Sequence, residues 1–171
     1  AVAVDSCTNA IFLSVKYCKK NNIHSDKLVN VPNQTYISVP QQIIHGGYKV
    51  NFIDLKWSGC YKLDPLPIID SAQRFTNGMY IKDTFYCLSD NKDAYLWFKK
   101  MRYDGRTSLM YNDLIDLNCN EIGYHMYMTP DQACRGIQDF YRINFYNEDR
   151  ATNDDYRVDL SKLKCFTSYE N

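Results

Sequence analysis

Short runs of β-favouring residues separated by turn signals dominate the pattern of hydrophobic and polar positions. Ala10–Cys18 begins fully apolar and then alternates, which predicts a strand that enters a core. Gln34–Ile44 and Tyr48–Trp57 are β-rich runs on either side of His45-Gly46-Gly47, so together they predict a hairpin. Pro40 places part of the first run at a sheet edge or in a bulge.

Two further hairpins are predicted in the middle of the chain. Phe75–Tyr80 contains Asn-Gly between β-prone residues, a strong signal for a tight turn. Ala94–Tyr103 and Arg106–Asp113 flank Asp104-Gly105, which gives a second turn of the same kind. Ala94–Phe98 is apolar on both faces of an extended chain, and we therefore expect a central strand there.

One helix start is clear in the sequence. Thr129 is a candidate N-cap, Pro130 suits the first helical position, and Gln132 completes a capping box. These signals predict a short helix over Asp131–Phe140.

The order of elements favours a β-rich fold. Arg142–Tyr146 and Tyr156–Phe166 are predicted as two more strands, which flank an acidic loop. Many strands and few helices predict a mainly β chain, a two-sheet β-sandwich with one or two short helices. The length of 171 residues indicates a single domain over residues 1–171.

Seven cysteines spread along the chain indicate disulfide bonds between distant strands. No C-x-x-C pair and no His/Cys cluster with zinc-ligand spacing is present, so a structural metal is not expected. Disulfides imply an oxidising compartment, and the Asn33-Gln34-Thr35 sequon offers Asn33 as a glycosylation site there. We therefore predict a secreted glycoprotein. The disulfide candidates, whose pairing stays open, are Cys7, Cys18, Cys60, Cys87, Cys119, Cys134 and Cys165.

Charge is balanced overall but uneven along the chain. Lys+Arg and Asp+Glu both total 20, which does not favour a nucleic acid or an anionic membrane as partner. Lys16–Lys27 is basic, whereas Asn144–Asp159 holds five carboxylates and two arginines, a net charge of −3. With fifteen tyrosines in the chain, such acidic and aromatic segments predict a face for a basic protein. The inferred face comprises Asp90, Asp93, Tyr146, Glu148, Asp149, Asp154, Asp155, Tyr156 and Asp159.

Candidate catalytic chemistry is sparse. His24, His45 and His125 lie in predicted loops, turns or strands without a partner motif. The chain contains no G-x-S-x-G, H-E-x-x-H or phosphate-binding glycine loop. We accordingly expect no cofactor, no metal and no enzymatic activity.

Three segments resemble a known viral family. Lys82–Trp97, Gly123–Met128 and the acidic segment Asn144–Asp159 are similar to the poxvirus SECRET domain, the smallpox virus-encoded chemokine receptor domain. That domain forms the C-terminal part of viral secreted tumour-necrosis-factor (TNF) receptors.

The resemblance implies a viral immune-evasion module that binds and sequesters host chemokines and blocks leukocyte migration. The chain would then be a secreted protein without a membrane span, alone or as part of a longer viral TNF receptor chain. Three alternatives stay open: a decoy of the same fold for a cytokine or a class I histocompatibility molecule, a disulfide-rich secreted hydrolase, and a structural domain that supports a neighbouring module.

Overall fold

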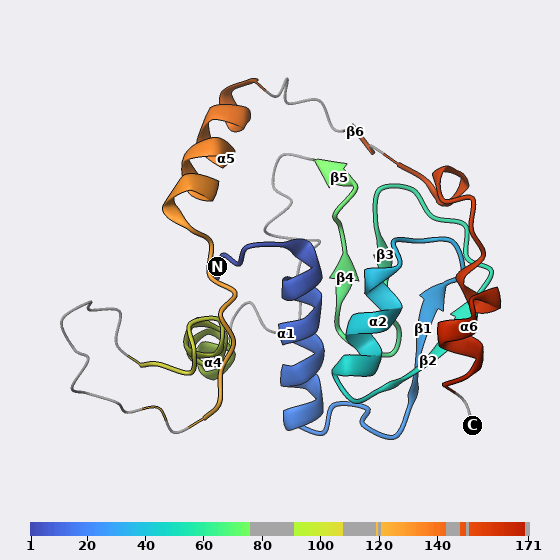
Figure 1. Cartoon of the computed structure of the whole chain (residues 1–171), viewed down its shortest axis with the longest axis horizontal. Coiled ribbons are helices and arrows are strands. Elements are labelled where there is room, and N and C mark those ends of the chain that lie inside the picture. Colours follow the sequence, from blue (N-terminus) through green and yellow to red (C-terminus); the bar gives the residue numbers. More distant parts are fainter. Residues whose placement is uncertain (76–90, 108–118, 120, 143–147, 150, 170–171) are drawn as a thin grey trace.

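The computed structural model describes residues 1–75, 91–107, 119, 121–142, 148–149 and 151–169 (Figure 1). Helices account for most of its regular structure, and the strands form three two-stranded sheets. The elements are α1 (Cys7–Lys20), β1 (Leu28–Pro32), α2 (Ser38–His45), β2 (Lys49–Ile53), β3 (Tyr61–Lys62), β4 (Ile69–Asp70), β5 (Arg74–Phe75), α4 (Lys92–Met101), α5 (Pro130–Arg142), β6 (Glu148–Asp149), the 3-10 helices η1 (Asn153–Asp155) and η2 (Leu160–Lys162), and α6 (Lys164–Thr167).

The predicted strand Ala10–Cys18 is wrong, because this segment belongs to helix α1. Ser6 caps the helix, and its hydroxyl accepts a hydrogen bond from the Asn9 N–H at 3.2 Å. Ile11, Val15 and Cys18 are buried at helical spacing and face the same core. The run begins with consecutive apolar residues, and such a run does not distinguish a helix from a strand.

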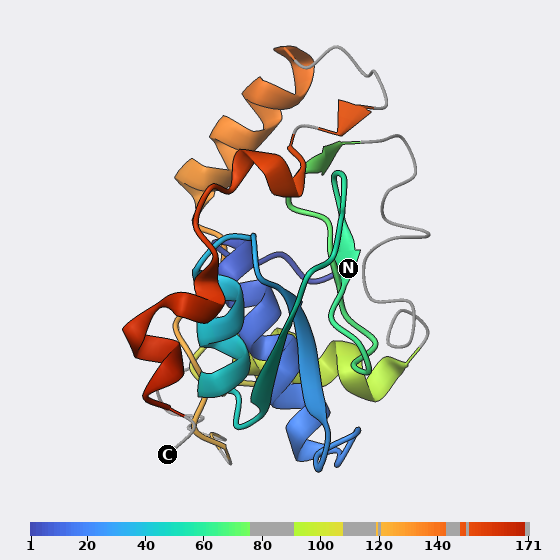
Figure 2. The same ribbon diagram turned by 90° about the vertical axis from the view of Figure 1, so that its right-hand side faces the viewer.

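The predicted hairpin across His45-Gly46-Gly47 is also wrong. β1 and β2 pair in parallel, Val29 opposite Val50, and α2 forms the crossover between them. The two glycines end α2 rather than turn a hairpin, and Gly47 has φ +93°. Pro40 is tolerated because it lies in the first turn of α2, where its missing N–H has no helical acceptor. Figure 2 shows helices α1 and α2 beside this parallel pair.

The main core lies between α1, α2 and the parallel pair. Buried side chains from these elements meet those of the stretch that follows β2, and all of them exclude water from one cluster. The buried members are Ile11, Val15, Cys18, Val29, Val31, Val39, Ile43, Tyr48, Trp57, Tyr61, Leu63, Leu66 and Ile68.

The predicted central strand Ala94–Phe98 is helix α4. The Asn91 side chain caps it by accepting hydrogen bonds from Asp93 N and Ala94 N, at 2.9 and 3.1 Å. Trp97 and Phe98 pack on Tyr17 of α1, and their ring centroids lie 5.2 and 5.3 Å, respectively, from the centroid of the Tyr17 ring. The apolar residues thus follow a helical period, although in an extended chain they would lie on both faces.

The helix predicted over Asp131–Phe140 is confirmed as α5. Its capping box is present: Gln132 N donates to Thr129 Oγ1 at 3.3 Å, and Thr129 N donates to Gln132 Oε1 at 2.8 Å. The predicted strand Tyr156–Phe166 is wrong, because this segment contains η2 and most of α6. The Asn77-Gly78 turn and most of Arg142–Tyr146 lie outside the described residues.

The mainly β, disulfide-bonded sandwich is therefore corrected to a helix-rich fold around one parallel βαβ unit. Among the six cysteines that the structure describes, no two are joined by a disulfide, and Cys87 lies outside that part. In the described part of the chain, no helix is both long and apolar enough to cross a membrane. The single domain and secretion stay predictions.

Gly46 sets how closely α2 approaches α1. A Cβ atom there would lie 2.2 Å from Val15 Cγ1 and 2.9 Å from Val15 Cβ. We expect Gly46→Ala to lower the free energy of unfolding by about 1–3 kcal/mol, because the added methyl overpacks the core. Urea denaturation measures the loss, and Gly136→Ala is the control, since beyond its own stretch of helix no atom of the described residues lies within 4 Å of its Cβ position. An equal effect of both substitutions would contradict this packing.

Candidate functional site

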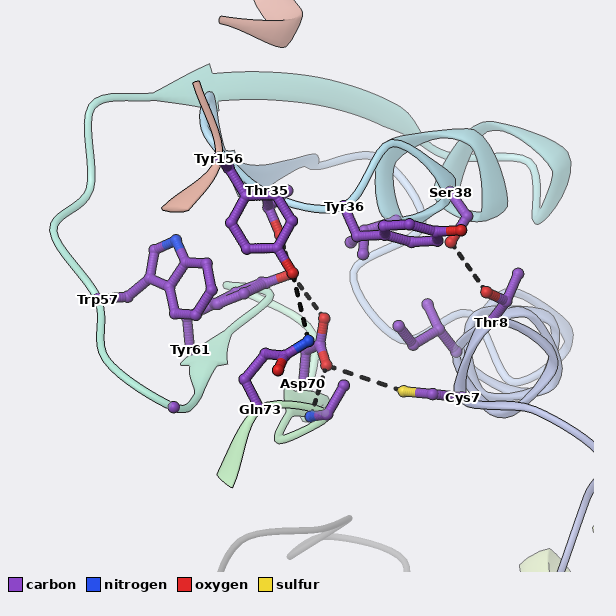
Figure 3. Close-up of a pocket in the computed structure, with 14 residues that line it drawn as sticks. Cys7, Thr8, Thr35, Tyr36, Ser38, Trp57, Tyr61, Asp70, Gln73 and Tyr156 are labelled. Carbon is purple, nitrogen blue, oxygen red and sulfur yellow. Dashed lines mark hydrogen bonds between the residues drawn. The ribbon is translucent and has the colours of Figure 1, made fainter. Parts of the chain in front are cut away.

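A cavity of about 220 Å³ lies beside the N-terminal end of α1, and we call it the Asp70 cavity (Figure 3). Four segments of the first half of the chain surround it, and one side chain from the C-terminal part closes it. Its lining residues are Cys7, Thr8, Ile11, Thr35, Tyr36, Ser38, Val39, Trp57, Gly59, Tyr61, Asp70, Ala72, Gln73 and Tyr156.

Asp70 places a buried carboxylate in this cavity, with a residue exposure of 7%. The apolar run Leu66–Ile69 leads into β4, and Asp70 is the last residue of that strand. Oδ1 accepts hydrogen bonds from Ala72 N at 3.1 Å and from Cys7 Sγ at 3.8 Å. Oδ2 accepts one from the Tyr61 hydroxyl at 2.6 Å.

A hydrogen-bond chain orients that carboxylate. Tyr61 has one hydroxyl proton and gives it to Asp70, so the Thr35 hydroxyl, 2.6 Å from Tyr61 Oη, must donate to Tyr61. Burial, followed by the Asp70 charge, raises the pKa of Tyr61 far above its ordinary value. Tyr61 therefore stays a protonated donor and holds Asp70 in one orientation.

Cys7 is the second side-chain donor to Asp70. The residue is exposed as a whole because it begins α1, but its thiol points toward the carboxylate (Figure 3). Burial of the thiol, followed by the Asp70 charge, raises the pKa of Cys7 to about 12. Near neutral pH it is a thiol donor and not a thiolate nucleophile.

We expect Cys7 to react slowly with iodoacetamide, because about one thousandth of it is thiolate at pH 9 if its pKa is about 12. Peptide mapping measures its alkylation rate against that of Cys134, which is exposed on α5. Asp70→Asn should lower the pKa of Cys7 part of the way and speed its reaction, since the carboxylate is the second cause of the shift. Equal rates for Cys7 and Cys134 at pH 9 would contradict the assignment.

The opposite side of the cavity can receive an anion. Ser6 accepts from the Asn9 N–H, but the first turn of α1 carries no acidic residue, so no negative side chain within that turn offsets the positive end of the helix dipole. Thr8 Oγ1 and Ser38 Oγ lie 2.9 Å apart and bring hydroxyls from the starts of α1 and α2 to one place. Oxygen atoms of an acidic group are the acceptors that this arrangement suits.

Aromatic rings close the cavity. Trp57 packs against Tyr61 and Tyr156, with centroid separations of 5.0 and 5.6 Å. Gln73 Nε2 donates to the Tyr156 hydroxyl at 3.3 Å and ties the C-terminal part of the chain to the cavity. These rings exclude water from one wall, which strengthens polar interactions inside.

Among the described members of the predicted binding face, Tyr156 alone lines the cavity. Two carboxylates of the predicted face instead accept hydrogen bonds from nearby backbone N–H groups: Asp155 Oδ2 accepts from Thr152 N at 2.8 Å, and Asp159 Oδ1 accepts from Ser161 N at 3.1 Å. Hydrogen bonds from Ser161 and Lys162 lower the pKa of Asp159. Asp154 pairs with Lys56 at 3.3 Å on the surface.

The remaining members of the face are scattered. Glu148 and Asp149 form β6, which pairs with β5, and Asp93 lies in the first turn of α4. Asp90 and Tyr146 lie outside the described residues. The face as a protein-binding surface stays a prediction.

The sequon has a defined environment. Asn33 Oδ1 is buried and has no hydrogen-bond partner among the residues that the structure describes, and the Thr35 hydroxyl is buried against Tyr61. Glycosylation of Asn33 stays a prediction. Within the described residues, no group of three His, Cys, Asp or Glu side chains could hold a metal ion.

Sequence reasoning missed Asp70, Tyr61 and the hydroxyls of Thr8 and Ser38. One signal was available, because an acidic residue comes directly after the apolar run Leu66–Ile69. Tyr61 and Asp70 are nine positions apart and lie opposite each other in the antiparallel pair of β3 and β4, and no periodicity in the sequence indicates this pairing.

Comparison with known proteins gives one match. The model of the DegT/DnrJ/EryC1/StrS aminotransferase family matches residues 1–79. No curated protein and no solved structure matches the chain. The match and the helical fold contradict the resemblance to the poxvirus SECRET domain. The expected non-enzymatic chemokine-binding function is contradicted by the same match.

The matched stretch and the cavity coincide. Of the fourteen residues that line the cavity, all except Tyr156 lie within residues 1–79. In its N-terminal part, which contains the Asp70 cavity, the chain is thus similar to the DegT/DnrJ/EryC1/StrS aminotransferase family.

Proposed function

We propose that this chain binds pyridoxal phosphate in the Asp70 cavity and acts as an enzyme of the aminotransferase type. One observation carries the proposal: the part of the chain that matches an aminotransferase family supplies all but one residue of a cavity with a buried carboxylate. Enzymes of that family depend on pyridoxal phosphate. The expectation of no cofactor is thereby replaced.

The residues of the cavity fit two parts of this cofactor. Asp70 matches the acidic partner that such enzymes place against the pyridine nitrogen. The first turn of α1, with Thr8 and Ser38, matches the requirement for phosphate, because helix N-terminal N–H groups and hydroxyls bind anions. The volume of about 220 Å³ is small compared with pockets for drug-sized ligands and suits a single substituted ring.

The third usual element is a lysine that joins the cofactor covalently. None of the described residues that line the cavity is a lysine. Asp70, Thr8 and Ser38 therefore account for non-covalent binding, and a covalent link needs a separate experiment.

When bound, pyridoxal phosphate supplies the electron sink that stabilises a carbanion next to an amino group. The contribution of the chain is to position and to protonate. Asp70, held by Tyr61 and the Ala72 N–H, would keep a proton on the pyridine nitrogen. Trp57 and Tyr156 would keep water from the ring.

Titration with pyridoxal phosphate, followed by absorption spectroscopy, tests the proposal. We expect saturable binding, and weaker binding of pyridoxal, which lacks the phosphate. Thr8→Ala with Ser38→Ala should reduce the difference between the two ligands, because these hydroxyls face the anion. A spectrum of the mixture that equals the sum of the spectra of the free chain and the free cofactor at every concentration would refute the proposal.

Reductive trapping with borohydride, followed by peptide mapping, then determines whether any lysine of the chain joins the cofactor. A trapped lysine would add the covalent link to the proposed site. Saturable binding without a trapped lysine would show that the cofactor is held non-covalently.

A further inference from the structure

A second hollow, which we call the Lys16 groove, lies beside the C-terminal half of α1 and has a volume of about 360 Å³. Three segments that are distant in the sequence surround it: α1, α4, which lies beside α1 in Figure 1, and residues 121–124. It shares no lining residue with the Asp70 cavity, which adjoins the N-terminal half of α1. Its lining residues are Lys16, Lys19, Lys20, Trp97, Met101, Glu121, Ile122 and Tyr124.

Positive charge exceeds negative charge in the Lys16 groove. Lys16, Lys19 and Lys20 have the spacing of one helix face. Of the described residues that line the groove, Glu121 alone is acidic. It pairs with Lys20 and, at 3.3 Å, with Lys100 of α4, and the hydrogen bonds from Lys20 and then Lys100 lower its pKa, so it stays ionised. Four ammonium groups thus meet one carboxylate.

The ends of two helices offset part of this charge. Lys19, Lys20 and Lys100 lie in the last turns of α1 and α4. Each helix end there carries roughly half a negative charge on its carbonyl groups. The four lysines, Glu121 and the two helix ends together leave a charge of about +2 in the groove. A ligand with two negative charges would balance it.

Lys16 is the lysine best placed to bind such a ligand. Lys19 donates to the Ser25 carbonyl oxygen at 3.0 Å, and Lys20 is paired with Glu121. Lys16 lies before the last turn of α1, so compensation of the helix dipole does not account for it. Within the part of the chain that the structure describes, it forms no ion pair. Its ammonium group therefore has donors to offer a ligand.

The other walls of the groove are aromatic and apolar. Trp97 and Met101 lie one turn apart on α4. Tyr124 packs edge-on against Phe12 of α1, with ring centroids 4.9 Å apart. Ile122, which also lines the groove, is 92% exposed. A ring attached to the anionic group would cover these side chains and remove apolar surface from water.

We propose that the Lys16 groove binds a small aromatic phosphate monoester. Such a ligand carries about two negative charges near pH 7 and has three strong acceptor oxygens for ammonium donors. The volume of about 360 Å³ lies in the lower part of the range for small-molecule sites. The inference does not rest on the proposed cofactor, because no residue of the Asp70 cavity takes part in it.

Isothermal titration calorimetry with phenyl phosphate tests the site, because this probe has the charge and the ring but no aldehyde that could react with a lysine. Binding should be saturable and tighter than that of inorganic phosphate, which lacks the ring, or of phenol, which lacks the charge. Lys16→Gln should weaken it roughly fivefold to tenfold, since a charge-assisted hydrogen bond is lost. Lys27→Gln is the control, because it removes the same charge from a lysine whose side chain is 62% exposed outside the groove, and it should bind like the wild type.

A gain of affinity distinguishes a binding site from lysines that only stabilise the fold. Glu121→Gln should tighten binding of phenyl phosphate about threefold, because Lys20 and Lys100 lose their carboxylate and can turn to the phosphate. A merely structural role of these lysines predicts no gain.

The fluorescence of Trp97 locates the bound probe. In a Trp57→Phe variant, Trp97 is the one remaining tryptophan of the chain, and its emission should change with the midpoint found by calorimetry. Three results would each overturn the proposal: no saturable binding of phenyl phosphate to the wild type, binding that neither Lys16→Gln weakens nor Glu121→Gln tightens, and unchanged Trp97 emission at saturating probe.

Discussion

Replacing Asp70 with alanine is expected to weaken pyridoxal phosphate binding about tenfold to a hundredfold. The substitution removes a charge-assisted hydrogen bond to the pyridine nitrogen, which contributes about 1.5–3 kcal/mol. It also leaves the Tyr61 hydroxyl without its acceptor at 2.6 Å, so the free energy of unfolding should fall by about 1–3 kcal/mol. Isothermal titration calorimetry measures the first effect, and urea denaturation measures the second.

Two matched variants separate these effects. Asp70→Asn keeps an acceptor for Tyr61 but removes the charge, so it should fold better than Asp70→Ala and still bind the cofactor weakly. Asp26→Asn removes an exposed carboxylate whose side chain is 77% exposed, and it should leave affinity unchanged. If Asp70→Asn binds as tightly as the wild type, the carboxylate is not the partner of the ring nitrogen.

Replacing Ile43 with alanine should give the largest loss of stability. Ile43 is fully buried, at 0% exposure, in the core that α1, α2 and the parallel strands share. Loss of three methyl or methylene groups at such a position costs about 2–5 kcal/mol, since the structure only partly fills the resulting space. Chemical denaturation at constant pH measures this change.

Ile37 provides the control for that experiment. It lies just before α2 and is 39% exposed, so Ile37→Ala should change the free energy of unfolding by about 0.5 kcal/mol or less. Equal losses in the two variants would mean that α2 does not face the core with Ile43 in the way described.

Local signals in the sequence predicted local structure well. The start of α5 was predicted because its capping box needs only Thr129 and Gln132, which are three positions apart, and Pro130 between them suits the first helical position. The N-caps of α1 and α4, Ser6 and Asn91, are also residues that favour a helix start. Their apolar stretches were instead interpreted as strands, since short apolar runs do not distinguish the two periods.

The parallel pair could not be predicted from local patterns. β-rich runs around His45-Gly46-Gly47 suit a hairpin, whereas the structure uses the glycines to end α2 and to admit Val15 of α1. That contact joins residues about thirty positions apart in the sequence. The choice between hairpin and crossover was therefore made by tertiary packing rather than by turn chemistry.

The candidate site was missed for a related reason. Net charge drew attention to Asn144–Asp159, where Asp155 and Asp159 cap short helical turns. The acidic group of the proposed site is a single carboxylate, Asp70, which carries little weight in a charge count. Its importance comes from burial and from Tyr61 and Cys7, and these contacts appear only in the folded chain.

Trp57 fluorescence tests the central claim most directly, because this residue lines the Asp70 cavity whereas Trp97 packs against Tyr17 elsewhere. In a Trp97→Phe variant, Trp57 is the one remaining tryptophan of the chain. Pyridoxal phosphate should quench its emission saturably, and Asp70→Ala should shift the midpoint to at least tenfold higher concentration. Unchanged Trp57 emission at cofactor concentrations that saturate the absorption spectrum would place binding outside this cavity and contradict the account.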